Sequence, residues 1–480
     1  MDKEQVFPAQ YSKIMLKAYL ILMKPELLLT AIIFLLLFIK IAGQLKNESF
    51  LALTQVLLLL NFIAGFFFNK AGSLFDNMYH TTALIVLQKN ILNLGVYLIS
   101  LLFTGWLKKT EHMPEFFMLM LSALLGMFFM ISSGNLLMFY LALELATIPV
   151  AAMANFDLEK KLSSEAAMKM ILSSAFSSGI LLFGISLVYG ATGTISFAEI
   201  PAMLDSSPLY ILIFVFLFTA FAFKLSIVPF HLWTADVYEG SPFAVTSFLS
   251  VISKGSVAFI FMATLYKVFQ PLQEVWYTML IILAIATMVV GNLFALRQQN
   301  IKRFLAFSSI AQVGFILVGM SSNSKAGTTA VVYFILVYIF SNLAAFGVAS
   351  AIASKTGKEN IDDYKGMYQT NPFLSWVLAL ALFSLAGIPP TAGFFGKLFL
   401  LTAGASKGTY MFITIAALNM IVSLFYYLKV IRAVFMEKNE RPIEKIAVHP
   451  STKFALIICA AGIVLLGLLS WVYDYIQNQF

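Results

Sequence analysis

Apolar runs long enough to cross a lipid bilayer recur along the whole chain of 480 residues, and they constrain the fold more than any other feature. A transmembrane helix needs about 20 consecutive, predominantly apolar residues. The sequence holds about 14 such runs. We therefore predict an all-α fold, a polytopic membrane bundle of about 14 transmembrane helices. The expected spans are 27–44, 51–68, 90–107, 115–133, 135–155, 165–190, 208–231, 243–264, 275–296, 302–320, 328–353, 372–404, 409–434 and 454–475.

The composition excludes a soluble enzyme. Hydrophobic residues make up 60% of the chain and charged residues only 11%, whereas soluble proteins carry about 25% charged residues. So few charges cannot cover a water-facing surface of this size. The connections between the runs are too short for a soluble domain, and the alternating pattern of β-barrel strands is absent. We expect a single integral membrane domain over residues 1–480.

The net charge of +8 gives a clue to orientation. Loop lysines and arginines gather on the side that holds Lys108, Lys160 and Lys355, which predicts that this side is cytoplasmic. The basic N-terminus argues the other way. The first residues, with Asp2 and Glu4, do not resemble a cleaved signal peptide.

Two expected spans, the seventh and the twelfth, contain prolines that should break them. Pro229 interrupts the seventh, and Pro389 and Pro390 interrupt the twelfth. Proline removes an intrahelical hydrogen bond, and opened backbone at membrane depth is tolerated only inside protein or beside a wet cavity. A simple proline kink is the alternative explanation for either break alone.

The spacing of the two breaks predicts an internal repeat. They lie five spans apart, and because five is odd, the second repeat should be inverted relative to the first. We predict two inverted five-helix repeats at 115–264 and 275–434, with three N-terminal helices in 1–114 and a C-terminal helix in 435–480. Paired broken helices of this kind are typical of ion-translocating folds.

Four charged residues lie deep inside expected spans: Glu144, Lys224, Lys254 and Lys397. Each would cost about 2.5–3.5 kcal/mol at the bilayer centre if it faced lipid. They must therefore face the interior, form pairs or change protonation. Glu144 and Lys224 could form a static ion pair between helices, and Lys254 and Lys397 could also be structural. The functional hypothesis is proton transfer, because buried lysines can load and release protons near neutral pH.

The helix breaks should affect the two flanking lysines differently. Lys224 should lie near the C-terminal end of a half-helix, where the helix dipole favours a cation. Lys397 should lie about one turn into a new half-helix, whose positive end disfavours its charge. We expect the two lysines to differ in proton affinity.

Other ionisable residues are secondary candidates for the same path. Lys169 and Glu165 are spaced as an interfacial ion pair in the sixth span. His231 follows the Pro229 break and could relay a proton or be structural. Asp236 and Glu239 lie in an expected polar loop and could gate an entrance or simply be solvated.

Four sequence motifs resemble the antiporter-like subunits of respiratory complex I. They are FKLSIVPFHLWTADVYEGSP around Lys224, LELATIPV with Glu144, SKGSVAF with Lys254 and LAGIPPTAGFFGK with Lys397. The resemblance covers essentially the whole chain and is strongest over about 115–435. The length and Lys397 resemble the N-type subunits more than the M-type, which carry a glutamate there.

The resemblance implies specific roles and partners. Glu144 and Lys224 would form a switching pair, Lys254 would continue a central axis and Lys397 would be the terminal proton donor. The eleventh span has no histidine, so its relay would need water and the hydroxyl or amide groups of Tyr333, Tyr338 and Asn342. The chain would be a multi-pass subunit of a hetero-oligomeric complex in a bacterial inner membrane and would bind no nucleic acid. NADH, FMN, iron–sulfur clusters and quinone would belong to partner subunits, with no cofactor or metal bound by this chain.

Two other functions remain open from the sequence. One is a Mrp-type cation/proton antiporter subunit, which would share the motifs without redox drive. The other is a structural subunit whose buried charges only hold helices together. No phosphate-binding loop, HExxH motif or Cys/His ligand cluster is present, and the single cysteine, Cys459, cannot hold an iron–sulfur cluster.

Overall fold

The computed structural model describes residues 16–43, 45–68, 70–440, 442–469 and 471–480. The N-terminal residues Asp2 and Glu4, for which no cleaved signal peptide is expected, lie outside the described residues.

The described chain is almost entirely helical, as the apolar runs predict. Thirteen of its helices are long and apolar enough to cross a membrane, and the twelfth expected span is divided between two shorter helices. The N-terminal part contains α2 (Lys24–Ala42), α3 (Asn47–Gly65), the hairpin β1 (Gly72–Leu74) and β2 (Tyr79–Thr81), α4 (Ala83–Leu102) and α5 (Thr104–Leu107). The next part contains α6 (Met113–Ile131), α7 (Leu136–Ala154), α8 (Lys161–Thr192), η1 (Ile200–Ala202), α9 (Pro208–Leu225), α10 (Leu232–Gly240), α11 (Phe243–Ser247), η2 (Phe248–Ser253) and α12 (Lys254–Lys267). The rest contains η3 (Gln270–Leu272), α13 (Gln273–Leu296), α14 (Ile301–Ser321), α15 (Lys325–Thr356), η4 (Ile361–Tyr364), α16 (Met367–Thr370), α17 (Pro372–Ala386), α18 (Ala392–Ala405), α19 (Tyr410–Phe435), α20 (Pro450–Leu468) and α21 (Trp471–Gln477).

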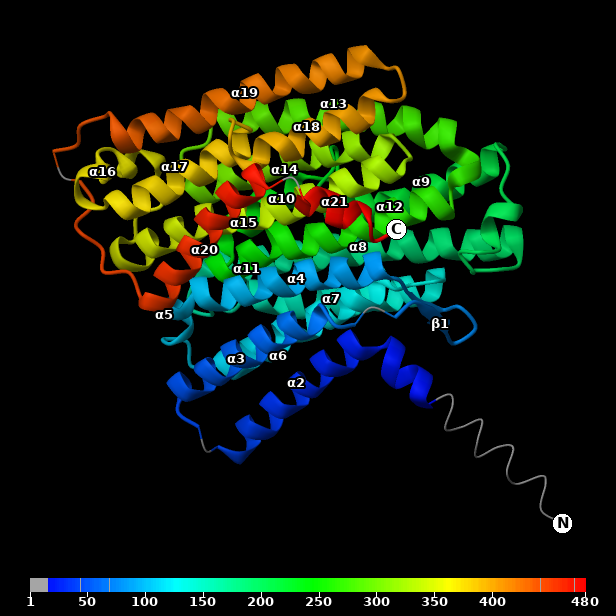
Figure 1. Cartoon of the computed structure of the whole chain (residues 1–480), viewed down its shortest axis with the longest axis horizontal. Coiled ribbons are helices and arrows are strands. Elements are labelled where there is room, and N and C mark those ends of the chain that lie inside the picture. Colours follow the sequence, from blue (N-terminus) through cyan, green and yellow to red (C-terminus); the bar gives the residue numbers. More distant parts are fainter. Residues whose placement is uncertain (1–15, 44, 69, 441, 470) are drawn as a thin grey trace.

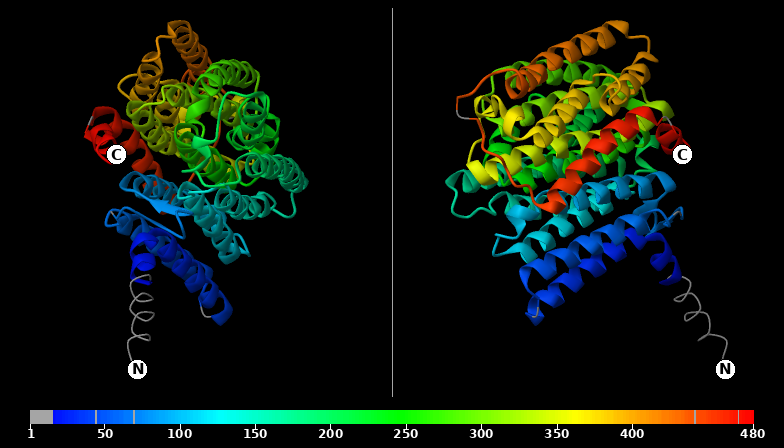
Figure 2. Two further views of the ribbon diagram at one scale, coloured as in Figure 1. Left: turned by 90° about the vertical axis from the view of Figure 1, so that its right-hand side faces the viewer. Right: turned by 60° about the vertical axis from the view of Figure 1, so that its left-hand side comes forward.

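The helices run roughly side by side, so the molecule has two ends that carry the connections (Figure 1). Helices α2 and α3 lie at one edge of the bundle and α19 lies at the opposite edge. The helix α20 crosses the flank of the bundle and returns the chain toward α4 (Figure 2), against which it packs. Helices α14 and α15 form the centre, because 100% and 94% of their spanning windows are buried.

The two predicted repeats share local features. The first helix pair of each packs backbone to backbone at a glycine: a Cβ on Gly126 would lie 2.5 Å from the Ala146 nitrogen, and one on Gly291 would lie 2.6 Å from the Ala311 nitrogen. The third helices, α8 and α15, both have 32 residues. The repeat boundaries remain a prediction, which these likenesses support.

The seventh and twelfth spans break at the predicted prolines, and the two breaks have similar backbones. Helix α9 ends before Ser226 and α17 ends before Gly387, and both terminal residues adopt the left-handed conformation, with φ of 64° and 86°. Such a residue closes a helix by turning its backbone away from the axis. The proline three residues later then prevents the helix from resuming in line.

The segment after the first break differs from the prediction. Asp236 and Glu239 lie in α10, a helix of 9 residues, and not in a polar loop. Proline and histidine at the break end the predicted span, but the chain forms a second helical segment directly after them. Both acidic side chains are therefore fixed on a helix packed against α8 and α14.

The third span and its charges were also misplaced from the sequence. The helix α4 begins at Ala83 rather than at 90, and it contains Lys89, which lies just before the expected span. Lys89 and Glu26 are each 1% exposed and form an ion pair of 2.5 Å between α4 and α2. The bilayer-embedded charges therefore include this pair in addition to the four expected ones. The start of this helix could not be recognised from the sequence, because its polar residues are buried only through partners on other helices.

The eighth span has an internal irregularity that the sequence did not reveal. The π-helical turn η2 separates α11 from α12, and Lys254 is the first residue after it. A π turn widens the helix locally and changes the direction of the side chains that follow, and such turns are frequent at functional sites. Here it lies directly before one of the candidate lysines.

Candidate proton-transfer site

Lys224 lies at the C-terminal end of α9, as the break predicts. Its ammonium donates hydrogen bonds to the hydroxyl oxygens of Thr147, at 2.7 Å, and Ser174, at 3.4 Å. Glu144 lies one turn before Thr147 on α7, yet it does not form an ion pair with Lys224. Its buried Oε1 has no hydrogen-bond partner within the part of the chain that the structure describes. The two residues of the predicted switching pair therefore lie near each other but are not in contact.

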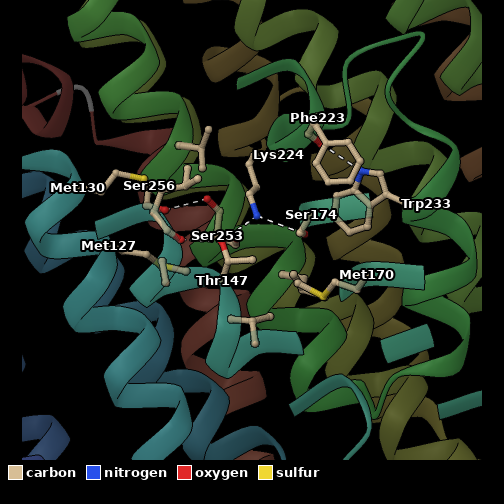
Figure 3. A pocket seen from close by; sticks show the side chains of 15 residues that line it. Met127, Met130, Thr147, Met170, Ser174, Phe223, Lys224, Trp233, Ser253 and Ser256 are labelled. Atoms are coloured by element: carbon tan, nitrogen blue, oxygen red, sulfur yellow. Dashed lines mark hydrogen bonds between the residues drawn. The ribbon is translucent and has the colours of Figure 1, made fainter. Parts of the chain in front are cut away.

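A cavity of about 20 Å³ lies beside the Lys224 ammonium. Figure 3 shows the residues that line it: Lys224 points toward Thr147 and Ser174, and Ser253 and Ser256 also line the cavity. A polar cavity needs about 10–15 Å³ to hold one water molecule. The space is therefore sufficient for a single water between Lys224 and the segment that leads into Lys254.

Lys254 is buried, at 3% exposure, in the centre of the bundle. Its ammonium donates a hydrogen bond of 2.6 Å to Ser309 of α14, and it lies 5.6 Å from the centre of the Tyr238 ring. A neutral hydroxyl and an aromatic face both interact favourably with a cation but do not neutralise it. Among the described residues, no acidic side chain lies within ion-pair distance of Lys254, so a static ion pair does not hold it there.

Helix α14 connects Lys254 to Lys397. Gln312 lies one turn after Ser309 and donates hydrogen bonds to the Leu385 carbonyl oxygen, at 2.9 Å, and to the Tyr427 hydroxyl, at 3.2 Å. Lys397 donates to the same Leu385 carbonyl, at 2.7 Å. The two lysines are thus linked through polar groups that are only one helical turn apart.

The expected effect of the helix dipole on Lys397 was wrong. Lys397 does lie just past the first turn of α18, but its ammonium reaches back to the carbonyl oxygens of Leu385 and Ala386 at the C-terminal end of α17. It therefore meets the negative end of one half-helix rather than only the positive end of the next. A lysine side chain is long enough to cross the break, so the position of its Cα does not decide which dipole it meets.

Two of the three expected groups of the eleventh span join the core network. The Asn342 amide donates to the Tyr338 hydroxyl, and the Ser250 hydroxyl donates to the Asn342 oxygen, each at 2.8 Å. Tyr333 does not join them, because it donates to the Leu466 carbonyl of α20 at the flank of the bundle.

All the secondary candidates except His231 form a separate ionic cluster. Lys169 contacts Glu165 at 2.7 Å and Asp236 at 2.6 Å. Arg303, which the sequence did not single out, bridges Asp236, at 2.8 Å, and Glu239, at 2.7 Å. Lys169 is thus more than the predicted pair with Glu165, and the cluster joins α8, α10 and α14.

Comparison with known sequences decides the family. Residues 133–423 match the family described as NADH:quinone oxidoreductase/Mrp antiporter, transmembrane. The chain belongs to this family.

Relatives of this antiporter-family chain extend over nearly its whole length. It is 46% identical to NADH-quinone oxidoreductase subunit N of Phocaeicola vulgatus over 95% of this chain and 98% of that protein. It is 40% identical to subunit N of Moorella thermoacetica over 74% of this chain and 75% of that protein. Among solved structures, a chain of respiratory complex I from Thermus thermophilus is 28% identical, with a TM-score of 0.79, over 93% of this chain and 98% of that one. A chain of the Mrp complex from Dietzia is 18% identical, with a TM-score of 0.85, over 95% of this chain and 96% of that one, and it shares the fold.

The antiporter-family chain also contains site residues that the sequence did not single out. Three hydroxyl residues accept hydrogen bonds from the lysines, and Gln312 shares the Leu385 carbonyl with Lys397, but all four are neutral residues with no distinctive spacing. The hydroxyl residues are Thr147, Ser174 and Ser309. Tyr427 of α19 is completely buried and accepts a hydrogen bond from Gln312. The signal that could have found them is their polarity within otherwise apolar spans.

His231 keeps a position compatible with either of its expected roles. It is 7% exposed at the Pro229 break, and its Nδ1 has no hydrogen-bond partner. Within the described residues, no group of three or more His, Cys, Asp or Glu side chains is placed to hold a metal ion.

Proposed function

We propose that this chain is the proton-translocating membrane subunit of an NADH-quinone oxidoreductase, in which electron transfer from NADH to quinone in partner subunits drives proton movement through this chain. The identity of 46% to subunit N of Phocaeicola vulgatus, over nearly the full length of both proteins, supports the assignment. The chain would work as a multi-pass subunit of a hetero-oligomeric complex in a bacterial inner membrane. NADH, FMN, the iron–sulfur clusters and quinone would bind to other subunits.

The observation that carries the proposal is a series of polar groups joining three buried lysines. Lys224 borders a cavity of about 20 Å³ that reaches Ser253, the residue before Lys254. Lys254 continues through Ser309 and Gln312 to the Leu385 carbonyl, where Lys397 is bound. A proton moves between hydroxyl groups, water and titratable side chains, and the lysines, Ser309 and a cavity large enough for one water would supply such groups. The Gln312 amide and the Leu385 carbonyl would hold the side chains in place beside Lys397.

In the proposed mechanism, Glu144 controls whether Lys224 holds its proton. A neighbouring carboxylate favours the charged ammonium, whereas the neutral hydroxyls of Thr147 and Ser174 favour it less. Glu144 and Thr147 lie one turn apart on the same face of α7. Movement of the Lys224 ammonium between them would therefore alternate between retention of the proton and its release toward the cavity and Lys254.

A Mrp-type antiporter subunit shares the fold, but its likeness to this chain is 18% in sequence. The much higher identity to subunit N favours coupling to a redox reaction.

The test is proton pumping by the assembled complex carrying Lys224→Met. Methionine keeps most of the volume but cannot carry a proton, so pumping per NADH oxidised should be lost while assembly is retained. Lys407→Met, in an exposed turn between α18 and α19, is the matched control and should pump normally. Normal pumping by the Lys224→Met complex would contradict the proposal, and failed assembly rescued by Glu144→Gln would instead favour a structural pair.

A further inference from the structure

A second cavity shares no lining residue with the cavity beside Lys224. It lies at the end of the bundle that carries α5 and α16 (Figure 1). Its volume is about 600 Å³. It lies where α4 runs into α5, where α15 ends and where α20 begins. Cavities of about 300–1,000 Å³ are typical of sites for small molecules.

The charged groups of this cavity are all basic. Lys109, Lys160, Lys355 and His449 line it, and no aspartate or glutamate does. Lys160 is paired with Asp157 at 2.8 Å, but Lys109 and Lys355 form no ion pair within the described part of the chain. The N-terminal end of α20, which follows His449 directly, adds its positive dipole to the same wall. The cavity therefore presents the ammonium groups of Lys109 and Lys355, which no acidic side chain of the described residues pairs with.

Much of the remaining lining of the cavity is apolar, although it also includes three hydroxyl side chains. Leu102, Phe103 and Trp106 contribute large apolar side chains to it. Beyond the rim, α20 exposes the large apolar side chains Phe454 and Ile457, which lie about one and two turns into the helix. A ligand with an anionic head and apolar tails would match the cavity and this outer face together.

We propose that this cavity, named here the basic cavity, binds the phosphate headgroup of an anionic phospholipid, with its acyl chains lying along α20. A basic cavity between transmembrane helices, at the side where loop lysines gather, has the chemistry that such headgroups require. Free phosphate shares the headgroup chemistry, but the apolar wall and the exposed face of α20 would contribute nothing to its binding. The two ligands can therefore be separated by experiment.

The experiment measures bound phosphatidylglycerol on the purified, delipidated intact complex. The lipid is added back in detergent micelles at limiting concentration, and the amount retained per complex is determined by mass spectrometry. The variant Lys109→Gln with Lys355→Gln should bind lipid at this site about 25-fold more weakly, because each lysine near an anionic headgroup contributes about fivefold. It should therefore retain one lipid fewer than the unaltered complex. The control Lys46→Gln with Lys438→Gln removes the same charge from exposed positions outside the basic cavity and should retain as much lipid as the unaltered complex.

A second measurement needs no variant and remains decisive if the double variant fails to assemble. Phosphatidylglycerol should protect Lys109 and Lys355 from acetylation in the unaltered complex, while Lys46 and Lys438 remain reactive. Phosphatidylcholine and millimolar inorganic phosphate should give no such protection. Equal lipid retention by both variants, protection by inorganic phosphate alone, or protection of Lys109 and Lys355 without any added lipid would each overturn the proposal.

Discussion

Two Glu–Lys combinations lie inside this bundle, and they differ in the way that separates structural from functional charge. Glu26 and Lys89 are in direct contact, and Tyr79 donates a hydrogen bond of 3.1 Å to the second carboxylate oxygen of Glu26. Glu144 and Lys224 are not in contact, and the lysine is held by hydroxyl groups beside a cavity. We call the first the closed pair and the second the open pair.

The closed pair has every property of a structural contact. Both side chains are 1% exposed, so removal of either partner would leave the other charge buried without compensation. The open pair leaves a carboxylate oxygen without a partner and gives its lysine neutral acceptors. A site that must change its protonation benefits from such incomplete pairing, because neither protonation state is locked. The difference lies in geometry, since the residue types are the same.

The largest predicted effect is on the closed pair. Lys89→Met should destabilise the protein by about 3–5 kcal/mol, because it leaves the Glu26 carboxylate buried and unpaired. The loss should appear as poor assembly or a lower unfolding temperature. The double variant Lys89→Met with Glu26→Met should recover most of the stability, and the complexes that assemble should pump normally. A pumping defect in this double variant would show that the closed pair is functional.

The next effect is on the position of Lys224. Thr147→Val removes the hydroxyl that accepts its shorter hydrogen bond, and a hydrogen bond to a charged group contributes about 1.5–3 kcal/mol. Proton pumping should slow by about tenfold or more. Thr147→Ser keeps the hydroxyl and is the control. If the valine and serine variants pump equally well in proteoliposomes, Thr147 does not position the lysine.

A smaller effect concerns pH near the closed pair. Burial, with the charges of Lys267 and Lys89, lowers the pKa of His80, on the hairpin outside the spans, to about 4. The pKa of an unfolded histidine is about 6.5, so the unfolded state binds more protons between these values and stability should fall as the pH drops from about 6.5 toward 4. His80→Gln should reduce this loss by about 1–2 kcal/mol. Unfolding temperatures at pH 7 and pH 5 measure it, and identical pH dependence in both proteins would contradict it.

The smallest predicted effect is on stability at the open pair. Glu144→Gln should change the free energy of unfolding by less than about 1 kcal/mol, because no ion pair is broken. Pumping should nevertheless fall, because the amide cannot act as the carboxylate in the switch. The contrast with Lys89→Met is the sharpest test of the comparison. A destabilisation as large as that caused by Lys89→Met would mean that the open pair is also structural.

Much of the architecture could be predicted from the sequence because the bilayer imposes its length on each helix. Most expected spans agree with the observed helices within a few residues, and Pro229 and Pro390 placed both breaks. The third span failed for a physical reason. Lys89 made its beginning look like a connection, whereas it is buried against Glu26 of another helix.

Only the charged residues of the candidate site could be predicted from the sequence. A lysine inside an apolar span is conspicuous because of its cost, so Lys224, Lys254 and Lys397 stood out. Ser309 and Gln312 did not, since a neutral polar residue in a span is common and its partner depends on tertiary packing. The hydrogen bonds of Lys397 to α17 depend on how two half-helices meet at the break, which no local pattern specifies.

The acceptor at which Lys397 and Gln312 meet is the main-chain carbonyl of Leu385. A substitution at position 385 changes the side chain and leaves this oxygen in place. Only a change in the course of the backbone, at Gly387 or the prolines after it, would move the oxygen. The hydrogen bonds at the Leu385 carbonyl are therefore insensitive to substitution of residue 385 itself. Only substitutions at the residues that form the helix break would alter them.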